Sequence, residues 1–407
     1  MKKVLLSLLV AVLIVAGASG LGYWWARESY VMAPPSADAL KDAIELALRP
    51  TARNISRDRV LILADQTTVT LQLIYRNDVA VRFGLKPEKE RFSWSATHGP
   101  LNHDEGKTSN VWQPPIRGGL ETVTVRFRGV YSLPHPFFNP EPVIVDRDAT
   151  LKALVPISGG LRQGSKLDGF ELGEYLDPLD PEVVQRFKLT SSWPHLHPDK
   201  FTPPRYFYRV APETKSLFLS QRFKLGDFAL DFPWFSLGLP QYVAVDSALL
   251  NKLEDLLDLM NRDGYALRGF TPIYGFRPPC YNLGTIERDG AESLKVPFSF
   301  HQYGKALDFI IDLDNDLVMD DLNHDGMSDT HDSAVILHYV NILDREYREA
   351  GSPLVGGAGL YDYHDFHERI QSPYIHVDVR GFTSPEGLLI RWPDKWPDGN
   401  PIEFGKI

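Results

Sequence analysis

The chain has 407 residues, a formal net charge of −10 and an isoelectric point near 5.7. This acidic balance excludes nucleic acid as a partner, because phosphate binding needs a surplus of Lys and Arg. The length predicts two globular units, since single cores stop growing at roughly 250–300 residues. Cys280 is the only cysteine, so no intrachain disulfide can form, and the fold must be held by its core or by metals.

Residues 1–25 begin with Lys2 and Lys3 and continue as an apolar run. A short apolar core followed by the small residues Ala16–Ala18 is typical of a cleaved secretory signal. The same run, about 20 residues long, can also span a bilayer as an uncleaved anchor. In both cases the two lysines stay inside and the rest of the chain is exported. We therefore expect a periplasmic or extracytoplasmic protein, attached to the inner membrane through residues 4–25 if the segment is not cleaved.

A β-rich module of unknown function is predicted at residues 38–215. Residues 38–48 favour a short helix, and apolar and polar residues then alternate with period two, which is typical of antiparallel strands. These strands are expected at residues 59–64, 68–76, 79–83 and 122–133. Proline-rich connections separate them, and the module carries no strong chemical motif.

Two histidines near the end of this module need separate consideration. His195 and His197 would share one face if their segment were extended, and could then bind a metal. Pro194 and Pro198 flank them and favour a loop instead. The loop is the simpler interpretation.

The second unit is expected at residues 219–392. Ser247 can cap a helix whose apolar residues recur every three or four positions, and residues 261–264 supply its end. A strand at residues 266–274 should follow, and then a turn at the segment PPCYN, residues 278–282. The helix is expected to lie in the core.

A metal-binding arrangement is indicated in the stretch SFHQYGKALDFIIDLD, residues 299–314. If a strand begins at Ala306, then Ala306 and Asp308 lie on the same face of it. Gly304 lets the backbone bend, so that His301 can turn back toward that carboxylate. An imidazole and a carboxylate together are ligands that zinc accepts.

The segment YIHVDVRG, residues 374–381, supplies the second half of this arrangement. His376, Asp378 and Arg380 occupy one face of a strand whose other face is apolar. Three ionisable groups are costly to bury without partners, so this face is expected to line a cleft or to bind a metal. Together the two segments offer His, Asp and His, which match a catalytic zinc site with one open position.

Four motifs, in order along the chain, resemble the zinc D-Ala-D-Ala peptidases of bacterial cell walls. This family shares its fold with lysostaphin-type enzymes and with the hedgehog signalling domain. The motifs are YGFRPPCYN (274–282), SFHQYGKALD (299–308), GGAGLY (356–361) and the His-x-Asp strand that contains His376. The resemblance covers roughly residues 219–392, and it implies an α+β fold with a hedgehog-like zinc domain behind the β-rich module.

Carried over residue by residue, the resemblance implies that His301, Asp308 and His376 ligate zinc. It also implies that Arg277 holds a carboxylate or carbonyl oxygen of the substrate. Zinc would polarise the scissile carbonyl and lower the pKa of its bound water toward about 7, and a guanidinium can stabilise the oxyanion that forms. The substrate would be peptidoglycan, cut at a terminal D-Ala or at a cross-link.

One position departs from the family. Many members place the general base, a Glu or Asp, three residues before the last histidine, where this chain has Pro373. Asp378 is one candidate for that role, although it can instead orient a metal ligand or Arg277. Other candidates lie in an insertion just before Pro373, namely His364, His367 and Glu368. A member without a base would be a catalytically inactive binding or scaffold protein of the cell envelope, and we keep this as the alternative function.

The segment DLNHDGMSDTHD, residues 321–332, matches the spacing of an EF-hand calcium loop. Gly326 takes the sixth position, where the chain must turn sharply. The oxygen ligands would come from Asp321, Asn323, Asp325, the Met327 carbonyl, Asp329 and Asp332. Asp332 stands where Glu is usual, and its shorter arm weakens bidentate binding. The sequence therefore predicts a structural calcium site; a calcium-dependent adhesion module without zinc is a third hypothesis.

Overall fold

The computed structural model describes most of the chain between Pro35 and Glu403. The described residues are 35–50, 55–83, 85, 87–105, 109–132, 141–230, 240–290, 296–362, 372–393, 395–396 and 400–403. The apolar segment 1–25, and with it the choice between signal and anchor, lies outside them. Within these ranges no helix is both long and apolar enough to cross a membrane.

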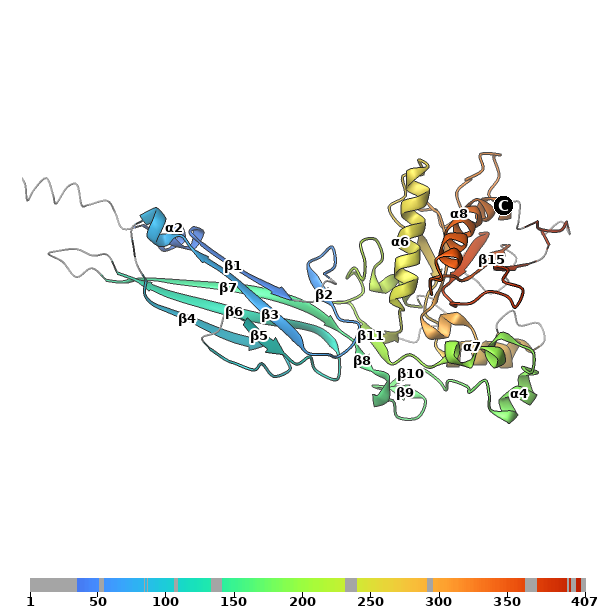
Figure 1. Ribbon diagram of the computed structural model, residues 1–407, viewed down its shortest axis with the longest axis horizontal. Helices are drawn as coiled ribbons and strands as arrows, with labels where there is room; N and C mark the ends of the chain where they lie inside the picture. The colour runs from blue at the N-terminus through green and yellow to red at the C-terminus, as the bar shows by residue number, and fades with distance from the viewer. Residues whose placement is uncertain are drawn as a thin grey trace, which may run out of the picture.

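The protein has an α+β fold with a β-rich part and a mixed part (Figure 1). One sheet of the β-rich part has the order β1-β3-β5, with strands Ile44–Pro50, Val69–Asn77 and Ser109–Trp112. The other has the order β2-β7-β6-β4, with strands Val60–Ile62, Val143–Val155, Gly119–Tyr131 and Pro87–Ala96. Buried side chains of both sheets, among them Leu71, Trp112 and Val125, form one core. The predicted β-rich character of this half is therefore confirmed.

Two short segments of this part differ from the sequence prediction. The helix predicted at residues 38–48 ends early: α2 spans Ala37–Asp42, and the chain then pairs as β1 with β3. The strand predicted directly after β3 is instead the helix α3, Val79–Phe83, whose first amide donates to Asn77 Oδ1. Five residues hold too little periodicity to separate strand from helix, and strand pairing overrides a local helix preference.

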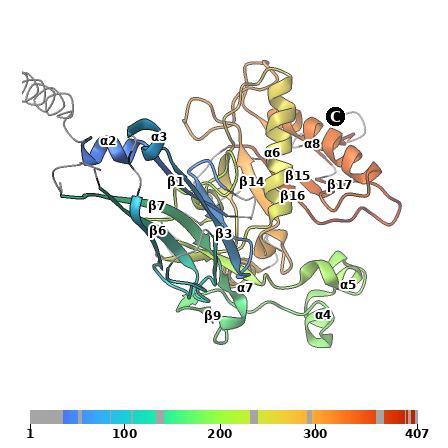
Figure 2. The ribbon, with the colours of Figure 1, turned by 60° about the vertical axis from the view of Figure 1, so that its left-hand side comes forward.

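Short elements connect the two parts. They are β8 (Ile157–Ser158), η1 (Gly159–Leu161), β9 (Lys166–Leu167), β10 (Phe170–Glu171), α4 (Pro181–Phe187), α5 (Trp193–Leu196), η2 (Pro198–Phe201), β11 (Tyr206–Val210) and η3 (Leu225–Phe228). His195 lies within α5, so it does not form the extended pair with His197 that a shared metal would need. In both ribbon views α4 lies beside the mixed part and away from the long strands (Figure 2).

The mixed part contains a five-stranded sheet with the order β13-β14-β16-β15-β17. Its strands are Thr271–Tyr274, Ala306–Ile310, Tyr374–Asp378, Gly357–Tyr361 and Ile390–Trp392. The helices are α6 (Ser247–Arg262), α7 (Pro279–Asp289) and α8 (Thr330–Glu349), and α6 and α8 lie side by side (Figure 1). The segment PPCYN, predicted as a turn, opens α7, because a proline at the first helical position loses no hydrogen bond.

Strand pairing crosses the expected boundary between residues 215 and 219. β11 pairs antiparallel with β12 (Gln241–Val243) on one edge and with β8 on the other. A single hydrophobic core also includes side chains from both sides of this boundary, such as Phe207 and Phe276. The same core also includes Val60, Ile62 and Leu154 from the β-rich part.

Candidate metal centre

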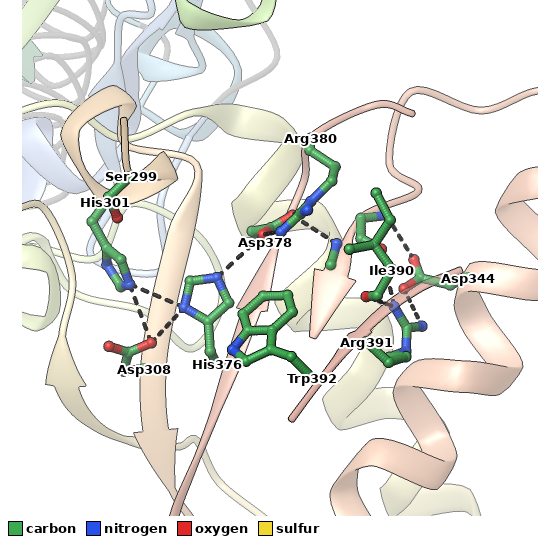
Figure 3. Close-up of polar contacts among 12 residues, drawn as sticks. Ser299, His301, Asp308, Asp344, His376, Asp378, Arg380, Ile390, Arg391 and Trp392 are labelled. Carbon is green, nitrogen blue, oxygen red and sulfur yellow. Dashed lines mark hydrogen bonds and ion pairs between the residues drawn. The ribbon is translucent and has the colours of Figure 1, made fainter. Parts of the chain in front are cut away.

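The three side chains predicted to bind zinc converge in the mixed part (Figure 3). His301 Nε2 lies 3.1 Å from both Asp308 Oδ1 and His376 Nδ1, and His376 Nδ1 lies 2.7 Å from Asp308 Oδ1. All three residues are buried. Two imidazole nitrogens and a carboxylate oxygen at these distances could hold a metal ion.

Two neighbouring strands and one glycine bring these ligands together. Asp308 in β14 stands directly opposite His376 in β16. His301 lies in the turn η6 (Phe300–Tyr303), which ends at Gly304 with φ of 67°. A Cβ atom at Gly304 would lie 2.4 Å from the Ala244 carbonyl oxygen, so a larger residue does not fit. The bend predicted at this glycine is confirmed.

The imidazole of His301 is oriented by its second nitrogen. His301 Nδ1 lies 2.7 Å from the Gly275 carbonyl oxygen, so Nδ1 carries the proton and Nε2 offers its lone pair. Burial, together with the positive charge of Arg277, lowers the pKa of His301 to about 4. His301 is therefore neutral near pH 7, which is the state in which imidazole binds a metal.

His376 presents its nitrogens the other way round. Nδ1 faces Asp308, and Nε2 lies 3.2 Å from Asp378 Oδ2. Burial alone would lower the pKa of His376, but the carboxylates of Asp308 and Asp378 outweigh it and raise that pKa. Burial would likewise raise the pKa of Asp308, but the two imidazoles outweigh it and hold that pKa well below its usual range. The carboxylate of Asp308 is therefore ionised near pH 7.

Asp378 has its oxygens fully engaged by the protein. Oδ1 accepts from the Gly357 amide at 2.7 Å and from Arg380 Nε at 2.9 Å, and Oδ2 faces Arg380 Nη2 and His376 Nε2. The residue is fully buried, and although burial raises its pKa, the Arg380 guanidinium outweighs this and holds the pKa well below its usual range. Of the two roles predicted for Asp378, this geometry disfavours the general base and supports the orientation of His376.

A buried network of charges fixes the backbone behind Asp378. Lys252 Nζ, from α6, donates to Asp344 Oδ1 at 2.6 Å and to the Asp378 carbonyl oxygen at 3.0 Å. Asp344 Oδ2 also accepts from Arg391 Nη2 at 2.8 Å (Figure 3). The side chains of Lys252 and Asp344 are 0% exposed, so each charge depends on its partner. The sequence analysis missed these residues, because nothing local marks them.

Arg277 lies close to the ligands, and part of its guanidinium has no hydrogen-bond partner among the described residues. Its side chain is buried, and Nη2 donates to Ser299 Oγ at 3.2 Å. Among the described residues no carboxylate pairs with this guanidinium, and its buried Nε has no hydrogen-bond partner. A buried cation with free donors suits a carboxylate or carbonyl oxygen of a ligand.

Asp308 and His376 line a cleft of about 930 Å³, and the fully buried His301 lies behind them. On one side the Trp392 indole donates to the Tyr361 hydroxyl at 2.9 Å, and its ring centre lies 5.1 Å from that of His376. A Cβ atom at Gly359 would lie 2.2 Å from Trp392, which explains a glycine in the motif GGAGLY. The other lining side chains are largely aromatic or apolar, including Phe187, Leu189, Trp193, Pro194, Val296, Phe298 and Tyr374.

No free proton acceptor is found in the described part of this cleft. Its only carboxylates there are Asp308 and Asp378, and both are engaged. Pro373 precedes β16 and offers no ionisable group. The remaining candidates from the sequence, His364, His367 and Glu368, lie outside the described residues.

The predicted calcium loop folds around its own side chains. Asp321 accepts hydrogen bonds from the amides of Asp325 and Gly326, and Asp325 Oδ1 accepts from the Met327 amide. Gly326 has φ of 87°, as a sharp turn requires. Asp329 caps α8, so the loop opens a helix as predicted.

Both carboxylate oxygens of Asp332 accept hydrogen bonds from backbone amides. Oδ1 accepts from the amides of Leu322 and Asn323, and Oδ2 accepts from the Asp329 amide. Burial raises the pKa of Asp332. Within the described residues the loop's carboxylates do not gather as three within 4.8 Å, whereas those of Asp312, Asp314 and Asp320 in the preceding loop do. The Asp-x-Asp spacing there was a signal that the sequence analysis left unassigned.

No family model matches this chain, and no curated protein matches it. The resemblance to zinc D-Ala-D-Ala peptidases is therefore carried by the motifs alone. The convergence of His301, Asp308 and His376 is an observation independent of that resemblance.

Metal affinity should fall at acid pH. Because the pKa of His376 is raised in the metal-free protein, its imidazole takes up a proton while the pH is still above the ordinary value of about 6.5. The proton competes with the metal, so affinity is full above the pKa of His376 and is lost as the pH falls through it. Calorimetric titration with Zn²⁺ between about pH 5 and 8 measures this, and an affinity that stays constant over that range contradicts it.

The substitution Asp378→Asn should weaken metal binding about 10- to 100-fold, because His376 loses the acceptor that orients it. The measurement is Zn²⁺ affinity, with thermal unfolding recorded in parallel because Arg380 loses its partner. Asp258→Asn, an exposed carboxylate on α6, is the matched control and should leave affinity unchanged. If Asp378→Asn binds zinc as tightly as the wild type, Asp378 does not position the ligand.

Proposed function

We propose that the protein is an exported zinc metallopeptidase that hydrolyses peptide bonds in peptidoglycan stem peptides or their cross-links. One observation carries this proposal: His301, Asp308 and His376 converge beside a cleft that Arg277 also lines, and the buried Nε of Arg277 has no hydrogen-bond partner among the described residues. Zinc suits this donor set, because three protein ligands leave a fourth position for water or substrate. The cleft is large enough for several residues of a peptide.

The sheet also supports the resemblance to zinc D-Ala-D-Ala peptidases and their hedgehog-like fold. The four motifs lie on or directly beside β13, β14, β15 and β16. These strands are consecutive neighbours in the order β13-β14-β16-β15. Segments that are up to 100 residues apart in sequence are thus gathered at one place, as a common active site requires.

Each of these residues has a distinct part in the proposed reaction. Zinc, when bound, supplies a Lewis acid and an activated water. Gly275 and Asp378 hold the two imidazoles with Nε2 of His301 and Nδ1 of His376 turned inward. Arg277 donates to the oxyanion that develops on the scissile carbonyl.

A second candidate is a catalytically inactive zinc-fold protein that binds the cell envelope. It is favoured by the engaged state of both cleft carboxylates, Asp308 and Asp378, and by Pro373 at the family's base position. Such a protein would bind zinc and stem peptides without turnover.

Incubation of the full-length protein with purified sacculi separates the two candidates. The peptidase should release soluble muropeptides, and chelation should abolish the release. His376→Ala should lose both the metal and the activity, because one of three ligands is removed. Products are identified by mass spectrometry and zinc by elemental analysis. Binding of zinc without any chelator-sensitive product would support the inactive scaffold.

We further propose that residues 321–332 bind calcium as a structural ion. Support comes from the turn at Gly326 and from the side chains of Asp321 and Asp325, which organise the loop backbone as an oxygen cage would need. Asp332 already accepts hydrogen bonds from the amides of Leu322 and Asp329, which argues that its carboxylate holds backbone instead of the ion. The loop lies between the two segments that supply the metal ligands. A well-ordered loop would therefore help to fix the positions of these two segments.

Calcium should raise the melting temperature by about 2–4 °C for each kcal/mol of binding free energy. Asp321→Ala should abolish the rise, because it removes the first ligand of the loop. Asp314→Ala, in the preceding acidic loop, is the matched control and should keep the rise. Differential scanning calorimetry with Ca²⁺ and with chelator measures this. Loss of the rise in Asp314→Ala alone would place the ion in the preceding loop.

A further inference from the structure

One wall of the cleft comes from residues 187–201, which precede the first proposed ligand by about 100 residues. This segment was expected to belong to the β-rich module. Phe187, Leu189, Trp193, Pro194 and Phe201 all line the cleft together with two of the proposed ligands, Asp308 and His376. Because this wall comes from outside the motif-bearing strands, it is the feature that can determine which substrates the site binds.

The wall is fixed firmly to the mixed part. Phe201 is 3% exposed and packs against Phe298, Phe300 and Tyr303, with ring centres 5.9, 4.9 and 5.6 Å away. Lys305 Nζ also donates to a backbone carbonyl of the segment at 3.3 Å. The segment therefore holds its place in the absence of a ligand.

Trp193 is connected to the residues behind the metal site. Its ring centre lies 5.6 Å from that of Phe382, on which His197 stacks at 4.1 Å. The Arg380 guanidinium lies over Phe382 at 5.8 Å and over Trp392 at 5.3 Å, and Arg380 in turn pairs with Asp378. The two walls of the cleft are thus held at a fixed separation across Arg380.

The chemistry of this wall is apolar. Its only polar side chains in the cleft are Ser191 and Ser192. The indole N–H of Trp193 has no hydrogen-bond partner among the described residues. A sugar ring needs amide or carboxylate groups beside an aromatic platform, and this wall lacks them. Aliphatic side chains of a peptide, with one acceptor for the indole N–H, match the wall.

We propose that residues 187–201 form the peptide-binding wall of the cleft and that Trp193 is a specificity-determining residue that packs against the aliphatic part of a stem peptide. This inference rests on the proposed function and names the part of the substrate that is recognised. Trp193 acts on substrate binding and not on the metal, since it contacts none of the three ligands.

The test uses the full-length, zinc-loaded protein and the free stem pentapeptide ending in D-Ala-D-Ala. Trp193→Ala should raise KM about tenfold and leave kcat and zinc content unchanged, the loss expected when one aromatic contact to a ligand is removed. Leu196→Ala is the matched control, because Leu196 is exposed on the same helix and does not line the cleft. Trp193→Leu keeps apolar packing on Phe382, and it replaces Trp193→Ala in the test if that variant unfolds.

Calorimetric binding of the same pentapeptide separates this proposal from the proposed function. If the wild type binds the peptide but does not cleave it, the proposal of a peptidase fails. The proposal of a peptide-binding wall is then still tested by the Kd of the peptide. A tenfold weaker Kd in Trp193→Ala, with Leu196→Ala unchanged, supports the wall. Equal KM and Kd in Trp193→Ala and the wild type would overturn it, and so would a wild type that does not bind the peptide.

Discussion

The antiparallel pairing of β14 with β16 is the constraint on which the candidate site depends. It sets Asp308 and His376 opposite each other on one face of the sheet. A register shift of one residue would turn one of the two side chains to the other face and separate them. His301 then needs only a short turn, closed by Gly304, to reach the same point. A candidate metal site of three side chains thus follows from one strand pairing and one glycine.

The buried charges behind this pairing explain how the site keeps its geometry. Lys252, Asp344 and Arg391 form one cluster, and Asp378 pairs with Arg380 beside it. Burial of such groups is costly, and apolar replacements of similar shape are often equally stable. We infer that the network's contribution is to fix the position of His376. The same residues link α6, α8 and β17 to the strand that carries this ligand.

The cleft is lined by segments from two distant regions of the sequence. Its floor lies on the motif-bearing strands, whereas one wall comes from residues 187–201. That wall joins the mixed part through a hydrophobic core in which Leu189 and Phe201 pack with Phe298, Phe300 and Tyr303. Composition alone did not indicate that β11 pairs with β12 across the predicted boundary, because proline-rich connections give no sign of strand pairing.

The sequence by itself determined the features that depend on local spacing. Period-two alternation identified the long strands β3 and β6 and placed His376 and Asp378 on one face, and residue spacing identified the three candidate ligands. The strand predicted at Val79–Phe83 was wrong, because five residues carry too little periodicity to distinguish a strand from a helix. Only the tertiary structure decided that Asp378 orients His376, that Lys252 and Arg391 support it, and that Trp193 reaches the cleft. These contacts join residues that lie between 2 and 189 positions apart, and their formation depends on packing and on hydrogen bonds in three dimensions that no local pattern records.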